Sequence, residues 1–213
     1  MRQDQAGRAP PPGTGEKRGI VLIAAQLDGG AVRIEDLTED NLVQAPEWGP
    51  PPRSCKYCLY WEHPELFAGG ARVGEEGLLA RKRAWLRRVR GEWGGCGKLL
   101  FLGGKAVGYA QYAPPRLLPA AREYPTGPGS EDAVLLACLF IVAAGYRGRG
   151  LGSALLTAIL EELEGRGAVA VETFARRGSA ENPSGPVEFY LKHGFRVLKE
   201  DPEFPLLRLE LTG

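Results

Sequence analysis

The sequence of 213 residues has few of the features that mark membrane, secreted or nucleic-acid-binding proteins. It contains no apolar run of about eighteen residues, so no transmembrane helix is predicted. The first residues lead into proline and glycine instead of an apolar stretch, and a secretory signal is therefore not expected. Lysine and arginine together number 27 and aspartate and glutamate 26. This balance gives no general argument for nucleic acid or a membrane surface as a partner.

Cysteine is also scarce, and the four thiols do not indicate a disulfide framework in an intracellular chain of this size. Cys55 and Cys58 form a C-x-x-C pair, which is half of a zinc site that His63 and Cys96 would complete. There is no second C-x-x-C pair, and partly buried reduced thiols are therefore the preferred interpretation. We predict no metal site and expect a cytoplasmic protein.

The composition, 44% hydrophobic and 25% charged, is typical of a globular protein. Residues 1–18 are rich in proline and glycine and nearly free of apolar side chains, so they are predicted to form a flexible tail. Residues 19–213 are predicted to form a single domain, because this length suits one hydrophobic core.

Residues 75–93 have the apolar spacing of an amphipathic helix. Its basic residues are expected mainly on the solvated side, and a basic platform for an acidic partner is the alternative. The tryptophans, all before residue 94, are expected to pack in the core, with a substrate pocket as the other interpretation. The apolar face comprises Leu78, Trp85, Leu86, Val89 and Trp93, and the basic residues are Arg81, Lys82, Arg83, Arg87, Arg88 and Arg90.

The centre of the sequence is an apolar strand followed by a glycine- and arginine-rich turn and an amphipathic helix. Residues 133–142 are all apolar, which predicts a strand covered on both faces. The glycines of the turn let backbone N–H groups approach a ligand, and the helix start adds free N–H groups and a positive dipole end. These features predict a phosphate-binding site formed by Arg147, Gly148, Arg149, Gly150, Leu151, Gly152 and Ser153.

Two familiar phosphate motifs fit this turn poorly. A P-loop needs a lysine before the serine or threonine that opens its helix, and Gly152-Ser153 lacks it. A dinucleotide fingerprint G-x-G-x-x-G matches Gly148 and Gly150 and would use Glu172 to bind a ribose. However, Ser153 replaces its third glycine, and the preceding strands are linked as hairpins. An NAD-type dinucleotide is therefore a weakened alternative.

Residues 147–152 resemble the Q/R-x-x-G-x-G/A signature of the GNAT superfamily of N-acetyltransferases. Residues 189–195, a tyrosine-bearing helix end followed by Gly-Phe, resemble the second hallmark of that family. The order of the expected elements matches as well: antiparallel strands, the apolar strand, the signature helix, a parallel strand, a short helix and a final hairpin. The resemblance covers residues 31–211.

The resemblance implies an α/β (α+β) fold, with a mixed sheet of about seven strands and helices on both faces. The fourth and fifth strands would splay apart to admit the cofactor, acetyl-coenzyme A. Its pyrophosphate would lie on the N–H groups of residues 147–152, and its pantetheine arm would run beside Phe140, Ile141 and Val142. Asn182 resembles an asparagine that contacts this arm, although it lies one residue further from Tyr190 than is usual.

The resemblance also implies catalytic roles. Tyr190 matches the tyrosine of the family, and its phenol, protonated at neutral pH, is the predicted general acid. Glu172 matches a glutamate used by members that acetylate protein N-termini and is the predicted general base. Glu131 and Asp132 are alternative bases just before the apolar strand. Each of these side chains also has a structural interpretation, as a packed residue or a solvated loop residue.

The predicted function is transfer of acetyl from acetyl-coenzyme A to a primary amine, on a small molecule or a protein, by direct attack. A coenzyme A-binding regulatory or interaction module without turnover is the alternative. The expected partners are the cofactor and an amine, without nucleic acid or membrane, and the expected state is a monomer or homodimer.

Overall fold

The computed structural model describes residues 20–21, 26–27, 30–49, 54–68 and 73–211. The tail predicted over residues 1–18 lies outside these residues. Of the helices that the structure describes, none has both the length and the apolar character needed to cross a bilayer.

The described strands form one mixed sheet in the order β1-β3-β4-β5-β6-β7-β9-β8, with β2 also paired to β3. The seven strands from β3 to β8 along this order confirm the predicted mixed sheet, and the two-residue strands β1 and β2 extend it. The bounds are β1 (Ile20–Val21), β2 (Gln26–Leu27), β3 (Gly30–Asp36), β4 (Gly97–Leu102), β5 (Lys105–Ala113), β6 (Ala133–Ile141), β7 (Ala170–Phe174), β8 (Arg196–Lys199) and β9 (Leu206–Glu210).

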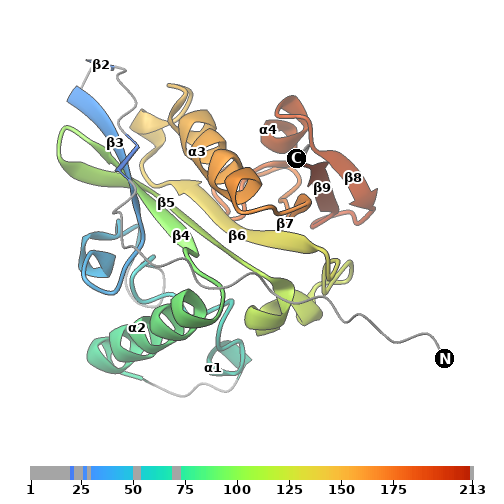
Figure 1. The fold of residues 1–213 in the computed structure, drawn as a ribbon, viewed down its shortest axis with the longest axis horizontal. Helices are drawn as coiled ribbons and strands as arrows, with labels where there is room; N and C mark the ends of the chain where they lie inside the picture. Colours follow the sequence, from blue (N-terminus) through green and yellow to red (C-terminus); the bar gives the residue numbers. More distant parts are fainter. Residues whose placement is uncertain (1–19, 22–25, 28–29, 50–53, 69–72, 212–213) are drawn as a thin grey trace.

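Helices cover both faces of this sheet, as predicted (Figure 1). The α-helices are α1 (Glu65–Ala68), α2 (Glu75–Glu92), α3 (Leu151–Gly165) and α4 (Val187–Lys192). Short 3-10 turns are η1 (Leu42–Gln44), η2 (Pro115–Leu117), η3 (Pro119–Glu123) and η4 (Ala144–Tyr146). The long helix predicted over residues 75–93 is therefore α2, and the helix predicted after the glycine turn is α3.

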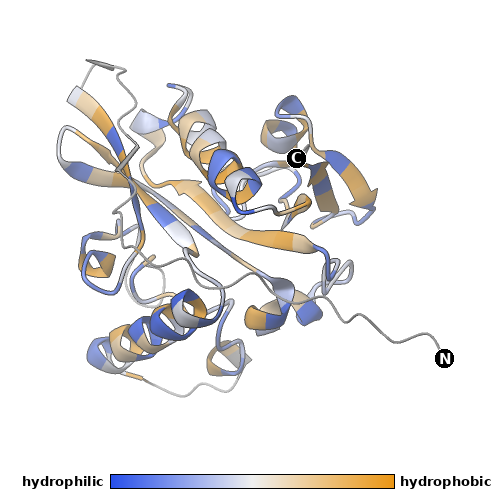
Figure 2. Cartoon of the chain, viewed as in Figure 1, coloured by the Kyte–Doolittle hydropathy of each residue, from blue (hydrophilic) through white to orange (hydrophobic). Residues whose placement is uncertain are grey.

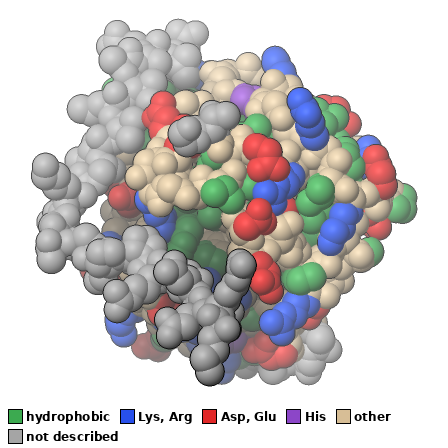
Figure 3. Space-filling model, turned by 45° about the vertical axis from the view of Figure 1, so that its right-hand side comes forward, with side chains coloured by type: hydrophobic (Ala, Val, Ile, Leu, Met, Phe, Trp, Pro, Cys, Tyr) green, Lys and Arg blue, Asp and Glu red, His purple; other side chains and the backbone are tan. Residues whose placement is uncertain are grey.

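The sheet separates two apolar layers, because side chains alternate between its faces along each strand. One layer packs α3 and α4 on the sheet, and the other packs α2 and the segments that precede it. All nine residues of β6 are buried, which agrees with the apolar run in the sequence. Figure 2 shows this apolar strand in the middle of the molecule between helices with polar outer sides. Charged side chains of both signs are interspersed over the face drawn in Figure 3.

The central strands β6 and β7 separate part-way along their length. They pair in parallel at three positions, the last of which joins Leu135 to Glu172. Strand β6 then continues to Ile141, and its Leu139 N–H donates instead to the carbonyl oxygen of Pro183 at 2.9 Å. The predicted splay of the two central strands is thus present, and its open end lies beside the glycine turn.

Candidate active site

The glycine turn joins the end of β6 to the start of α3. Gly148 has φ of +72°, and Gly150, the residue that caps α3, has φ of +80°. Glycine adopts this left-handed conformation without the steric cost that a β-carbon imposes. A β-carbon at either position would have no other atom within 4 Å, so backbone conformation and not space requires glycine there. The turn leaves the first N–H groups of α3 available for an anion.

A groove of about 510 Å³ opens at this turn, between the end of β6, the start of α3 and α4. Most of the predicted cofactor-binding residues line it: Phe140, Ile141, Arg147, Gly148, Gly150, Gly152 and Ser153. The groove is also lined by residues that were not predicted as site residues: Leu139, Ala180, Gly185, Pro186, Phe189, Lys192 and His193. The last three lie within the hallmark of residues 189–195, which is the signal that points to them.

Four predicted cofactor residues do not line this groove. The N–H group of Val142 pairs with Val107 on β5, and its side chain lines a different groove. Leu151 is buried in the core, and Arg149 is half-buried beside the groove. Asn182 forms a turn, in which its side-chain oxygen accepts from the N–H of Ser184 at 2.9 Å.

Arg147 is turned back onto the end of β6. Its Nε donates to the carbonyl oxygen of Ile141 at 2.9 Å, and its guanidinium lies 5.0 Å from the centre of the Phe140 ring. It also forms an ion pair with the exposed Glu181. Arg147 therefore braces the turn while it contributes positive charge to the groove.

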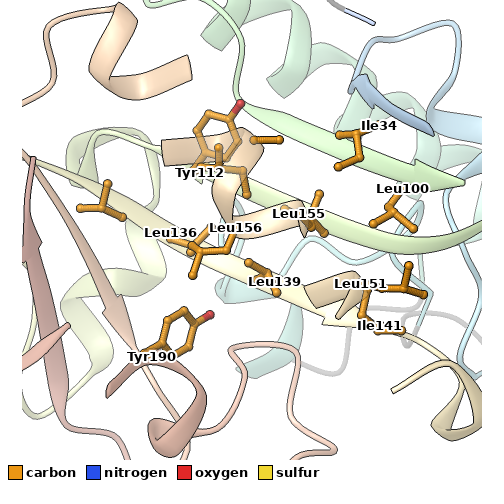
Figure 4. Packing of buried hydrophobic residues seen from close by; sticks show 14 of the residues in the cluster. Ile34, Leu100, Tyr112, Leu136, Leu139, Ile141, Leu151, Leu155, Leu156 and Tyr190 are labelled. Atoms are coloured by element: carbon orange, nitrogen blue, oxygen red, sulfur yellow. The ribbon is translucent and has the colours of Figure 1, made fainter. Parts of the chain in front are cut away.

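Tyr190 lies directly behind the groove wall. It is fully buried in the layer that contains α3, and Figure 4 shows it together with Leu136 and Leu139 of β6. Its hydroxyl donates to the carbonyl oxygen of Ser184 at 2.8 Å. A β-carbon built on the lining residue Gly185 would be 3.1 Å from this hydroxyl. Burial raises the pKa of Tyr190, which keeps the phenol protonated.

Glu172 occupies the point where β6 and β7 separate. Its carboxylate is fully buried and accepts hydrogen bonds from Ser130, from the N–H at 2.8 Å and the hydroxyl at 2.6 Å. Arg208 donates to the same carboxylate at 3.0 Å. The neighbouring Asp132 is exposed and accepts from Arg208, whose hydrogen bonds lower the pKa of Asp132. Glu131 is exposed on the same loop.

A family model described as an acetyltransferase (GNAT) domain matches residues 97–197, which include the glycine turn, the groove and α4. This part of the chain is thus similar to the GNAT family of acetyltransferases. A sequence comparison with curated proteins gave no match.

Solved structures share the fold of this chain. An N-acetyltransferase from Staphylococcus aureus Mu50 has a TM-score of 0.53 at 15% identity, covering 86% of this chain and 100% of its own. The PaiA N-acetyltransferase from Thermoplasma acidophilum, in complex with coenzyme A, has a TM-score of 0.50 at 14% identity, covering 84% and 99%. Ard1 from Thermoplasma volcanium has a TM-score of 0.50 at 14% identity, covering 85% and 99%. The antiparallel pairing of β5 with β6 also differs from the parallel strands of a dinucleotide-binding fold.

The opposite face of the sheet contains a buried ion pair that the sequence did not predict. Lys82 was expected on the solvated side of α2, but its side chain is buried and pairs with the buried carboxylate of Glu62. The helical period explains the error, because Lys82 lies four residues from both Leu78 and Leu86 and so shares their face. Burial alone would lower the pKa of Lys82, but attraction to Glu62, the hydrogen bond to it and the nearby thiols together outweigh burial and raise that pKa.

This ion pair is the centre of a polar network inside the apolar layer. The ammonium of Lys82 also donates to the carbonyl oxygen of Cys58 at 3.0 Å and to the side-chain oxygen of Gln111 at 2.6 Å. Gln111 in turn donates to Glu62 at 2.8 Å and accepts from the hydroxyl of Tyr109 at 2.7 Å. The network fixes α2 to β5 and to the segment with the C-x-x-C pair.

The cysteines of this face are packed thiols. Burial raises the pKa of Cys55 to about 12, and it also raises the pKa of Cys58. Cys138, on β6, accepts a hydrogen bond from the indole N–H of Trp61 at 3.2 Å. Within the described part of the chain, no three histidine, cysteine or acidic side chains converge as a metal site. Reduced thiols are poor nucleophiles in this state, because only the thiolate reacts readily.

Trp61 packs in the core of this face, as expected for the tryptophans. Its ring stacks on Tyr124 with centroids 5.4 Å apart, and Tyr124 stacks on Phe174 of β7 at 4.3 Å. Because Trp61 also contacts Cys138 on β6, this aromatic stack spans the two strands that separate. It covers the side of the gap that faces away from α3.

Proposed function

We propose that this GNAT protein transfers an acetyl group from acetyl-coenzyme A to a primary amine. The observation that carries the proposal is the groove, which joins a helix start with free N–H groups to the gap between β6 and β7. A relative with this fold, PaiA from Thermoplasma acidophilum, was solved in complex with coenzyme A.

The residues present fit the cofactor. Left-handed glycines at 148 and 150 leave the backbone open, and the N–H groups of α3 that follow would hold a pyrophosphate. Arg147 and Lys192 add positive charge to the lining. The apolar side chains of Phe140 and Ile141 would lie along a pantetheine arm. Bound acetyl-coenzyme A would supply the thioester whose acetyl group the amine attacks.

Tyr190 is the proposed proton donor to the departing thiolate. Its hydroxyl carries a proton throughout the neutral range, because burial raises the pKa of Tyr190. Gly185, which lines the groove and has no side chain, lies next to this hydroxyl. Donation requires the hydroxyl to leave the carbonyl oxygen of Ser184 and turn toward the groove. The general base has to remove a proton from the substrate ammonium, because only the neutral amine can attack the thioester.

Glu172 is the proposed general base, and Glu131 is the alternative. Glu172 is favoured by its position where the strands separate, although Ser130 and Arg208 already hold its oxygens. Glu131 is exposed and has no such constraint. A Glu172→Gln variant should therefore lose the acidic limb of its pH–rate profile, whereas a Glu131→Gln variant should keep it.

The substitution Tyr190→Phe tests the proposed acid. We expect kcat to fall by at least about 10²-fold, while acetyl-coenzyme A still binds. Thiol release against a panel of primary amines measures kcat, and calorimetry measures cofactor binding. Tyr112→Phe is the matched control, because Tyr112 is an equally buried tyrosine whose hydroxyl donates to Glu162, away from the groove. Equal kcat values for the two variants would remove Tyr190 from the mechanism.

A coenzyme A-binding module without turnover is the second candidate. It is favoured by the aromatic stack of Trp61, Tyr124 and Phe174, which covers the gap on the side where an amine would approach. The same amine panel separates the two candidates. Cofactor binding without thiol release on any amine would favour the module.

A further inference from the structure

His193 links α4 to the start of α3 at the edge of the groove. Its ring nitrogen Nδ1 lies 2.7 Å from the carbonyl oxygen of Phe189, and its Nε2 lies 2.9 Å from the hydroxyl oxygen of Ser153. Both His193 and Ser153 line the groove. Ser153 is the third residue of α3, so its N–H belongs to the first turn, which has no carbonyl partner within the helix.

The two contacts fix where the hydrogens lie. A carbonyl oxygen only accepts, so Nδ1 of His193 carries a hydrogen and donates to Phe189. In the neutral ring Nε2 then has no hydrogen, and it accepts from the hydroxyl of Ser153. The single hydroxyl hydrogen of Ser153 is therefore directed away from the groove, and its lone pairs remain for the groove. Phosphate oxygens also only accept, so this state suits a phosphate poorly.

Protonation of His193 reverses the second contact. The ring gains a hydrogen at Nε2 and donates it to the Ser153 oxygen, which frees the hydroxyl hydrogen to turn into the groove. The ring also gains a positive charge beside the start of α3. Both changes favour an anion at this point, the first through a new donor and the second through charge-assisted attraction.

The other charges at the groove couple this protonation to anion binding. Arg147 contributes positive charge from the turn and Lys192 from α4, and Glu181 lies outside the lining, paired with Arg147. On α3 the neighbour of the His193 ring is the uncharged Ser153, and on α4 it is Phe189, whose ring centre is 4.4 Å away. A bound diphosphate would offset the positive charge of these residues and of a protonated His193.

We infer that His193 takes up a proton when the diphosphate of coenzyme A binds, and that Ser153 then donates to that diphosphate. The inference rests on the proposed function, since it concerns the same groove. Affinity should rise as the pH falls, because binding is coupled to the uptake of a proton.

Calorimetry with 3′-dephospho-coenzyme A tests this directly, because that probe lacks the terminal phosphate that would itself titrate near neutral pH. We expect the binding heat at neutral pH to differ between Pipes and Tris buffers by an amount that corresponds to a fraction of a proton taken up. The His193→Gln variant should give the same binding heat in both buffers, because no proton is exchanged with the buffer. It should also lose the roughly tenfold gain in affinity between weakly alkaline and weakly acidic pH.

Two further variants sharpen the test. His63→Gln removes the only other histidine, which contacts Glu65 at 2.9 Å on the α2 side of the sheet, and it should keep full proton uptake. Ser153→Ala should weaken binding at every pH while uptake persists, because the charge on His193 remains. Binding by the unmodified protein without uptake, or uptake retained in His193→Gln, would overturn the inference and leave the proposed function standing. Failure of the unmodified protein to bind coenzyme A would instead overturn the proposed function.

Discussion

The two faces of the sheet are covered by the amphipathic helices α2 and α3, which differ in the residues that they bury. Helix α3 directs an apolar stripe at the sheet, and its ionic contacts lie at its C-terminal end, where Glu162 meets Lys98 and Arg166. Helix α2 also directs an apolar stripe at the sheet, but Lys82 occupies one position of that stripe. The α3 face is thus stabilised by apolar packing, whereas the stability of the α2 face also depends on the buried ion pair between Lys82 and Glu62.

The largest expected effect breaks the buried ion pair of the α2 face. Lys82→Met should lower the free energy of unfolding by about 3–5 kcal/mol, because it leaves the charge of Glu62 buried without its cation. The double variant Lys82→Met with Glu62→Leu should recover most of this loss, since no uncompensated charge remains. Urea unfolding measures both. Lys105→Met, at an exposed lysine on β5, should change stability by less than about 0.5 kcal/mol.

A smaller effect is expected on the α3 face, where backbone conformation matters more than charge. Gly150→Ala places a β-carbon on a residue with φ of +80° and should cost about 1–2 kcal/mol. Gly145→Ala is the control, because its φ is not positive and a β-carbon there also has open space. Thermal unfolding of the two variants compares them. An equal loss of stability in both would show that the left-handed cap of α3 is not what requires glycine.

The smallest effect concerns the ionic contacts of Glu162 on α3. Burial alone would raise the pKa of Glu162, but Lys98 and the hydrogen bonds from Lys98 and Tyr112 outweigh it and lower that pKa. Its contribution to stability is therefore present above the ordinary glutamate pKa of about 4.3, and it disappears as the pH falls through the lowered value.

The matched variant for this contribution is Glu162→Gln. The unmodified protein should lose about 1 kcal/mol more than the variant as the solution becomes strongly acidic, which is the range for a partly exposed ion pair. Urea unfolding at a series of acidic pH values measures the difference. Parallel curves for the two proteins would contradict it.

The sequence predicts the parts of the fold that are encoded by neighbouring residues. The burial of β6, the glycine cap of α3 and the hallmark of residues 189–195 are each contained in one short run, so pattern and turn chemistry are enough to find them. The sheet order then follows from the order of the elements and from the resemblance of two such runs to the GNAT family.

The parts that the sequence does not predict depend on partners that are distant in the chain. Lys82 and Glu62 are 20 residues apart, and Ser153 and His193 are 40 apart. Glu172 is held by Arg208, 36 residues away, and that contact comes from the pairing of β7 with β9. A single sequence contains no periodicity or spacing that connects such pairs, because only the fold brings them together.

The hydrogen bond between Leu139 and Pro183 sets a limit on the open edge of β6. Along that edge the N–H of Leu139 is bound by Pro183, and the carbonyl of Ile141 is bound by Nε of Arg147. Alternate residues of a strand point their peptide groups to the same edge, so the carbonyl of Leu139 and the N–H of Ile141 lie between these two contacts. These two groups are thus placed to pair with an extended molecule that enters from the glycine turn, and the contact of Leu139 with Pro183 ends that stretch of the edge.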